Sequence, residues 1–170
     1  DIASCLVGSE MCIRDRLKGL ILPIPQLTNH GLLPDGIHDC TYAEAFTRFA
    51  INPAREIIWQ NLMTTVEEMH TESLSGDLHL DGSFVTDKPV PEDIDVILDV
   101  RNEPAVQQGL ALRYFHLNHV NLKARNVDWW PSLPAENNFV SFFQYVGSKT
   151  ATVKGLAPKD RKGILRITQW

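Results

Sequence analysis

Two aspartates separated by one residue, Asp93 and Asp95, follow the pair Gly82-Ser83 at a short distance in the sequence. The β-branched, apolar run at 94–100 predicts a strand, whose side chains alternate between two faces, so both carboxylates are expected on one face. Neighbouring carboxylates repel each other unless a cation lies between them, and Mg²⁺, which takes oxygen ligands and usually bridges to phosphate, fits that role. The glycine lets a ligand approach the backbone, and its N–H and that of the serine can face a phosphate. These residues therefore predict a site for metal and triphosphate.

The loop between the two motifs, residues 84–92, is stiffened by Pro89 and Pro91 and carries one cation, Lys88. A nucleotide site needs positive charge besides the metal, which favours a contact between Lys88 and the triphosphate. A solvated loop lysine is the alternative, and the sequence leaves both open.

The order Gly-Ser, nine residues, Asp-Ile-Asp-Val at 82–96 resembles the signature of the polymerase-β-type nucleotidyltransferase superfamily. In that superfamily a third carboxylate comes from a later strand beside the acid-x-acid strand, and the resemblance gives this role to Asp128. The alternative is that Asp128 caps a turn before Pro131. The residue before the glycine is usually apolar in the superfamily and is Asp81 here.

A second resemblance covers most of residues 31–167 and concerns an uncharacterised family of small bacterial nucleotidyltransferase-like proteins. It rests on the run Gly-Leu-Leu-Pro-Asp-Gly-Ile-His-Asp-Cys-Thr at 31–41, which precedes the motif at 81–96, and on Lys-Gly-Ile-Leu-Arg-Ile at 162–167. Together the resemblances imply an α+β fold: a small mixed β-sheet with helices packed on it, as in the minimal nucleotidyltransferases.

The activity implied is Mg²⁺-dependent transfer of a nucleoside monophosphate from an NTP, with ATP as the expected donor, to a protein or small-molecule acceptor. Asp93, Asp95 and Asp128 would hold two Mg²⁺ ions, and Gly82 and Ser83 would hold the phosphates. One alternative is a catalytically degenerate fold that acts as a nucleotide sensor or binds a partner, such as a toxin in a toxin–antitoxin or defence pair. The acid before the glycine and the scarcity of basic residues near the loop favour this alternative. A purely structural protein, with the acids on a solvated edge, fits the spacing least.

Length and composition agree with one domain. The chain has 170 residues and is 44% hydrophobic, enough for a core of its own. Its net charge of -5 argues against a nucleic-acid-binding surface, and no apolar run approaches the length of a membrane span. Residues 6–16 resemble a translated sequencing adaptor, so 1–16 are excluded from the fold and 17–170 form the expected domain. Without that segment Cys40 is the only cysteine, which fits a reducing cytoplasm.

The remaining pattern predicts the elements that position the candidate residues. Capping signals and helical spacing predict helices at 41–49, 52–70, 102–120 and, from an ambiguous apolar run, 139–146. Strands are predicted at 77–81, 94–100, 122–130 and 163–168. Residues 17–39 are expected to form an arm packed on the domain, and 148–162 a loop. His79 is expected to be an exposed or hydrogen-bonded strand residue.

Overall fold

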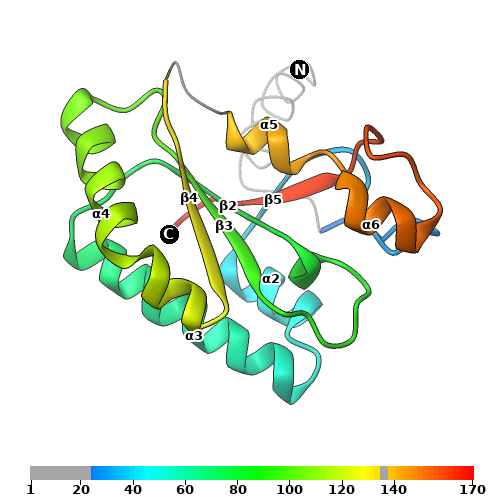
Figure 1. Ribbon diagram of the computed structural model, residues 1–170. Coiled ribbons are helices and arrows are strands. Elements are labelled where there is room, and N and C mark those ends of the chain that lie inside the picture. Colours follow the sequence, from blue (N-terminus) through cyan, green and yellow to red (C-terminus); the bar gives the residue numbers. More distant parts are fainter. Residues whose placement is uncertain (1–23, 135–137) are drawn as a thin grey trace, which may run out of the picture.

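The structure of the protein, a computed structural model, describes residues 24–134 and 138–170. These residues form an open sheet of five strands with helices on both faces, which confirms the predicted α+β fold (Figure 1). The elements follow in the order β1 (Gly36–Cys40), α2 (Tyr42–Phe49), α3 (Pro53–Thr71), β2 (Asp77–Asp81), the 3-10 turn η2 (Ser83–Val85), β3 (Ile94–Asp99), α4 (Ala105–Ala124), β4 (Val127–Ser132), α5 (Phe139–Phe143), α6 (Gly147–Lys154) and β5 (Gly163–Ile167).

The sheet is mixed, and its strands lie in the order β1-β5-β2-β3-β4. β2 runs antiparallel to β3, whereas β3 and β4 are parallel and are joined through α4. β5 lies between β1 and β2, parallel to the first and antiparallel to the second. The last strand of the chain is thereby placed beside the strand that leads into Gly82.

The starts of α2 and α3 follow from their capping residues, as predicted. The Thr41 side chain accepts a hydrogen bond from the Glu44 backbone N–H, and the Glu44 carboxylate accepts one from the Thr41 N–H in return. The Asn52 side chain accepts from the Arg55 N–H, and Pro53 occupies the first helical position. Both helices therefore begin where the sequence indicates.

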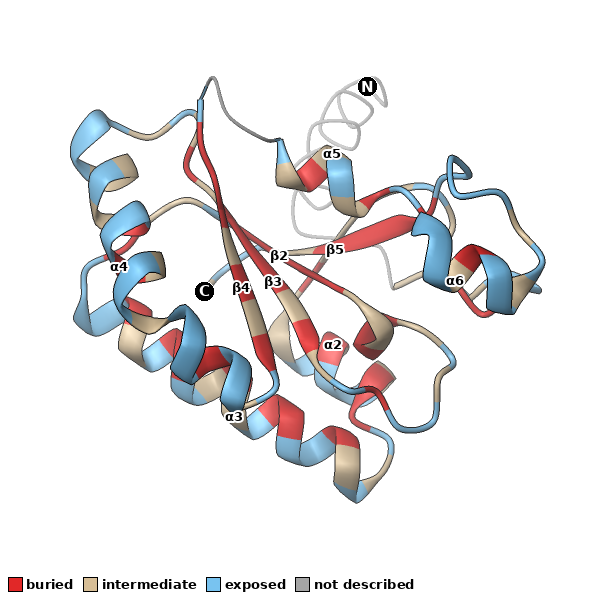
Figure 2. Cartoon of the chain, viewed as in Figure 1, coloured by how far each residue is buried: buried red, intermediate tan, exposed pale blue. Residues whose placement is uncertain are grey.

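Opposite faces of the sheet are covered by different helices. On one face α3 and α4 enclose the main core, in which Leu122 and Trp129 are almost fully buried. On the other face Val140 of α5 packs with Ile97 and Ile164. The central strands are accordingly buried, while the outer sides of α3 and α4 face solvent (Figure 2). None of the helices described here has the length and apolar character needed to cross a membrane.

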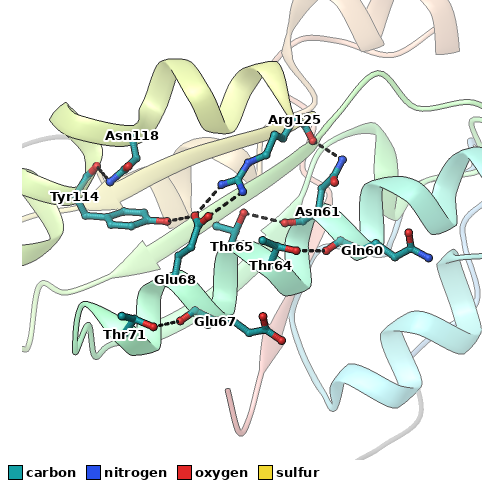
Figure 3. Close-up of polar contacts among 10 residues, drawn as sticks. All are labelled: Gln60, Asn61, Thr64, Thr65, Glu67, Glu68, Thr71, Tyr114, Asn118 and Arg125. Carbon is teal, nitrogen blue, oxygen red and sulfur yellow. Dashed lines mark hydrogen bonds and ion pairs between the residues drawn. The ribbon is translucent and has the colours of Figure 1, made fainter.

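The turn that leads into β4 is fixed by α3 (Figure 3). The Arg125 guanidinium, at the C-cap of α4, donates to both oxygens of Glu68 at 2.8 and 2.7 Å, and the Tyr114 hydroxyl donates to the same carboxylate at 3.3 Å. The Asn61 amide donates to the Arg125 carbonyl at 2.8 Å. These bonds fix the point at which the chain enters β4, and with it the position of Asp128.

The predicted boundary between 102–120 and 122–130 is wrong. The helix α4 continues to Ala124, and β4 begins only at Val127. Leu122 belongs to the helix because its side chain is buried against the sheet. The turn comes at Asn126, whose φ of +63° ends the helical path. Asparagine tolerates this left-handed conformation better than most residues.

Two further elements lie where none was predicted. β1 falls within the expected arm, and α6 occupies the first half of the expected loop at 148–162. The run assigned to a helix at 139–146 is helical only for Phe139–Phe143. Residues 1–16, which were predicted to stand apart from the fold, lie outside the described residues. The start of the predicted arm, residues 17–23, lies outside them as well.

Candidate active site

Three carboxylates lie side by side across three neighbouring strands. Asp95 of β3 is paired in register with Asp128 of β4 and, on its other side, with Asp81 of β2. Paired residues of adjacent strands project from the same face of a sheet, so the three side chains share one face. Asp93 precedes β3 by one residue. The structure thus brings Asp128 beside the acid-x-acid motif, as the sequence predicted.

Gly82 brings the backbone against the carboxylate of Asp95. Its φ is +82°, and a Cβ placed on it would lie 2.3 Å from Asp95 Oδ2. This close approach therefore requires glycine. The Ser83 Oγ that follows is buried and has no hydrogen-bond partner in the described part of the chain. A buried hydroxyl without a partner is uncommon and marks a place where a ligand oxygen or water can bind.

A cavity of about 640 Å³ opens over these residues. Gly82, Ser83, Asp93 and Asp95 line its polar side, and its opposite wall includes the exposed aromatic residues Phe142 and Tyr145, from α5 and the segment after it. Clefts of this size, largely apolar with a few convergent polar groups, are typical of small-molecule sites. Asp128 does not line the cavity and lies next to it through its pairing with Asp95.

Lysines neutralise the outer carboxylates of the cavity. Lys88 contacts Glu92 at 3.0 Å, and Lys149 of α6 contacts the other oxygen of Glu92 at 3.6 Å. Lys154, also from α6, contacts Asp87 at 2.6 Å. The pairs of Lys149 and Lys154 join α6 to the loop between β2 and β3 across the cavity. Because all of them include a group with substantial exposure, an anionic ligand can displace the carboxylates at modest cost.

The inner carboxylates, by contrast, are left with excess negative charge. Within residues 24–134 and 138–170, neither Asp93 nor Asp95 forms an ion pair. Burial, together with the charges of Asp81, Asp93 and Asp128, raises the pKa of Asp95 to about 8. Burial and the neighbouring Asp128 also raise the pKa of Asp93. In both cases burial is the largest cause and the charge of neighbouring carboxylates adds to it, and a bound cation would favour the ionised forms.

The donor set fits Mg²⁺ in chemistry, although it does not form a closed cage. Asp128 Oδ2 accepts from the exposed Lys123 ammonium at 2.8 Å. In the described residues no three His, Cys, Asp or Glu side chains are grouped closely enough to hold a metal ion by themselves. Mg²⁺ is commonly held by one or two carboxylates together with substrate phosphates and water, so Asp93 and Asp95 suffice for the protein's share. A metal contact to Asp128 would replace the Lys123 ammonium.

Sequence reasoning missed three cations of this site. The sequence indicated Lys88 and otherwise few basic residues near the loop. In the folded chain basic residues are not scarce there, because Lys149, Lys154 and Lys162 also line the cavity. The first two lie on the unpredicted helix α6, and the third precedes β5. No local spacing links them to the motif at 82–96. Only Lys162 lies in a run that the sequence analysis singled out, at 162–167.

The expectation for His79 is wrong. The residue is only 2% exposed, and its Nδ1 has no hydrogen-bond partner among the described residues. Burial lowers the pKa of His79 to about 4, so the ring is neutral at physiological pH. It shares the sheet face of Asp81 and lies two residues earlier on β2, outside the cavity.

Comparisons with known proteins place the chain in a family without naming a reaction. A model described as "Family of unknown function (DUF6932)" matches residues 25–168, which include every candidate site residue. Neither the curated proteins nor the solved structures contain a match.

Proposed function

This chain belongs to the DUF6932 family of unknown function, and we propose an activity for it. The activity is Mg²⁺-dependent transfer of a nucleoside monophosphate from an NTP, with ATP as the expected donor, to a protein or small-molecule acceptor. The observation that carries the proposal is the juxtaposition of Asp95 and Asp128 on adjacent strands, with Asp93 beside them and Gly82 against the Asp95 carboxylate. This arrangement agrees with the polymerase-β-type nucleotidyltransferase pattern suggested by the sequence.

In the proposed reaction an oxygen of the acceptor forms a bond to the α-phosphorus while the bond from that phosphorus to the pyrophosphate oxygen breaks. Pyrophosphate leaves with the bonding electron pair, and the proton of the acceptor hydroxyl passes to the Asp128 carboxylate. Mg²⁺, when bound through Asp93 and Asp95, supplies charge neutralisation for the triphosphate. The protein acts through positioning and electrostatics, which account for most of the catalysis in phosphoryl chemistry.

The remaining cavity residues fit the nucleotide. The Ser83 Oγ can donate to a phosphate oxygen, which would give that buried hydroxyl a partner. Lys88, Lys149 and Lys154 can exchange their exposed carboxylate partners for the triphosphate or for the departing pyrophosphate. The proposed contact of Lys88 is therefore one of several.

A second candidate is nucleotide binding without turnover, as in a sensor or in a partner-binding protein of a toxin–antitoxin or defence pair. The Lys123–Asp128 ion pair favours it, because a carboxylate held by an ammonium is a weaker ligand and base. Asp81 favours it as well, since an acid stands where the superfamily usually has an apolar residue. We propose the reducing cytoplasm as the compartment, in line with the buried free thiol of Cys40.

Calorimetric titration with ATP, with and without Mg²⁺, tests the proposal. We expect binding that requires Mg²⁺ and is lost in Asp93→Asn/Asp95→Asn. The matched control is Asp99→Asn on the same strand, because Asp99 is bonded to Arg101 at 2.7 and 2.8 Å and does not line the cavity.

Pyrophosphate release in the presence of candidate acceptors then separates the two functions. Release that depends on Asp128 supports the transferase, whereas tight binding without release supports the sensor. A folded wild-type protein that binds none of the four nucleotides would contradict both.

A further inference from the structure

We propose that Lys162 is an anion-contacting residue of the cavity, presented to the phosphate chain of the nucleotide by a buried ion pair with Asp81. The inference rests on the proposed function in taking the anion to be a phosphate chain. It assigns a role to Asp81, the acid that stands where the superfamily usually has an apolar residue. It also assigns a role to Lys162, which lies 81 residues away from Asp81 in the sequence.

The pair is buried at the edge of the cavity. Lys162 is 8% exposed and Asp81 1% exposed, and both line the cavity. Lys162 Nζ donates to Asp81 Oδ1 at 2.5 Å and also to Oδ2. Buried ion pairs contribute little net stability, and an apolar pair of similar volume often serves the fold as well. Their presence here is better explained by a function that needs the charge.

The position of the pair places the ammonium within the candidate site. Asp81 is the register partner of Asp95 and directly precedes Gly82. A lysine ammonium has three N–H donors, and the Asp81 carboxylate takes two of them. The third is free to bind a phosphate oxygen, because no other partner of Nζ exists among the described residues.

The backbone around Lys162 is fixed before any ligand binds. Its N–H donates to the Gln144 carbonyl at 2.8 Å, and the N–H of Gly163 donates to the Leu33 carbonyl at 2.9 Å. A Cβ on Gly163 would lie 2.1 Å from the Pro34 carbonyl oxygen, so the chain is held tightly against this segment. A charge placed in advance loses little freedom when it binds its ligand.

Lys162 differs in this respect from the other lysines of the cavity. The side chains of Lys88 and Lys149 are 40% and 85% exposed, and that of Lys154, which is bonded to the half-exposed Asp87, is 18% exposed, against 10% for Lys162. An ammonium shielded from water interacts more strongly with an anion and is screened less by salt. We therefore assign to Lys162 the main cationic contact and to the exposed lysines a supporting one.

Titration with Mg²⁺-tripolyphosphate, which carries the phosphate chain without base or sugar, tests the assignment. The variants are Lys162→Met and the double variant Asp81→Val/Lys162→Met, with Lys159→Met as control because Lys159 is exposed and does not line the cavity. We expect both Lys162 variants to bind at least tenfold more weakly than wild type, and the control to bind normally. The tenfold loss corresponds to removal of one charged hydrogen bond.

The double variant separates an anion contact from a merely structural role. If Lys162 only neutralises Asp81, removing both charges restores wild-type affinity, and that result overturns the inference. If Lys162 contacts the anion, the double variant stays defective while it folds and still binds Mn²⁺. Should Lys162→Met alone fail to fold, the double variant, which leaves no buried charge unpaired, carries the test.

The inference and the proposed function fail in different ways. Wild-type protein that binds neither tripolyphosphate nor any nucleotide overturns both. Wild-type protein that binds Mg²⁺-ATP through Asp93 and Asp95, with unchanged tripolyphosphate affinity in the Lys162 variants, overturns the inference alone.

Discussion

Gly82 brings the backbone close to a carboxylate in the candidate site. The Asp95 side chain occupies the space that a Cβ at position 82 would need, and the positive φ favours glycine independently. Two separate requirements for glycine at one position show that the turn is shaped around Asp95.

Replacing this glycine should therefore destabilise the fold. For Gly82→Ala we expect a loss of about 1–3 kcal/mol in the free energy of unfolding, because the new methyl group clashes with Asp95 and the backbone is strained. Gly109→Ala is the matched control: Gly109 lies within α4 with no atom near its Cβ position, so alanine should stabilise by about 0.5–1 kcal/mol. Urea unfolding measures both. Equal behaviour of the two variants would contradict the close approach at Gly82.

At the residue scale, the predictable part of the site was the part that is local in sequence. Gly82, Ser83, Asp93 and Asp95 fall within one short stretch, and period-two alternation alone places the two acids on one face. Lys162 could not be assigned to the site from the sequence, because it lies near Asp81 only when β5 lies beside β2 in the sheet. Strand order of this kind is a property of the whole sheet and leaves no spacing in the sequence.

At the element scale, Arg55 joins the start of α3 to the loop between β2 and β3. It is 1% exposed, and its guanidinium donates to the carbonyls of Phe49, Phe84 and Lys88, the last at 2.5 Å. Its guanidinium carbon also lies 4.8 Å from the centre of the Phe84 ring. One side chain thus satisfies carbonyls at the end of α2 and in the segment between β2 and β3, which lines the cavity.

Removing this connection should loosen both segments together. For Arg55→Leu we expect a loss of about 2–4 kcal/mol in the free energy of unfolding, because the buried carbonyls lose their donor. The control Arg48→Leu, on the exposed side of α2 with Gln26 as its side-chain partner, should change stability by less than about 0.5 kcal/mol. Urea unfolding compares them, and hydrogen exchange at residues 84–88 should rise in Arg55→Leu alone. Unchanged exchange there would show that the loop is held by other contacts.

The elements that the sequence predicted correctly are those with strong local signals. The capping residues of α2 and α3 and the apolar alternation of β3 each depend on neighbours within a few positions. β1 was missed because it begins with the turn-forming Gly36 just after Pro34, and its pairing is with β5, far away in sequence. α6 was missed because its polar sequence buries only Ala151. This helix is held by the small cluster of Ala151 with Leu32, Val146 and Leu156, together with ion pairs across the cavity.

At the scale of the whole molecule, charge is distributed unevenly. The chain carries a net charge of -5, yet four lysines line one cavity in which Asp93 and Asp95 have no lysine or arginine partner among the described residues. A site that contains both lysines and unpaired carboxylates suits a complex of a metal cation with a phosphate anion. The net charge argues against a nucleic-acid-binding surface, whereas the proposed binding of a small nucleotide through its metal does not need an overall positive chain.

This distribution predicts how global stability depends on pH. The pKa of Asp95 is raised to about 8 from an ordinary 3.8, so between these values the folded chain holds a proton that the unfolded chain has lost. Stability then falls with rising pH by about 1.4 kcal/mol per unit and levels off near the folded pKa. His79 has the opposite effect, because its pKa is lowered to about 4: it makes stability rise with pH, mainly below pH 6.5. The window from pH 6.5 to 8 therefore isolates the carboxylates.

Urea unfolding at pH 6.5 and 8, in metal-free buffer, measures this effect. We expect wild type to lose about 1–2 kcal/mol across the window and Asp95→Asn, which mimics the protonated form, to lose much less. Asp99→Asn should keep the wild-type slope, because Arg101, against the opposing effect of burial, lowers the pKa of Asp99 and leaves it ionised throughout. Mg²⁺ should abolish the wild-type decline, since the ion favours the ionised carboxylate and binds more tightly as pH rises. A decline that persists unchanged in saturating Mg²⁺ would show that the acids do not bind the metal.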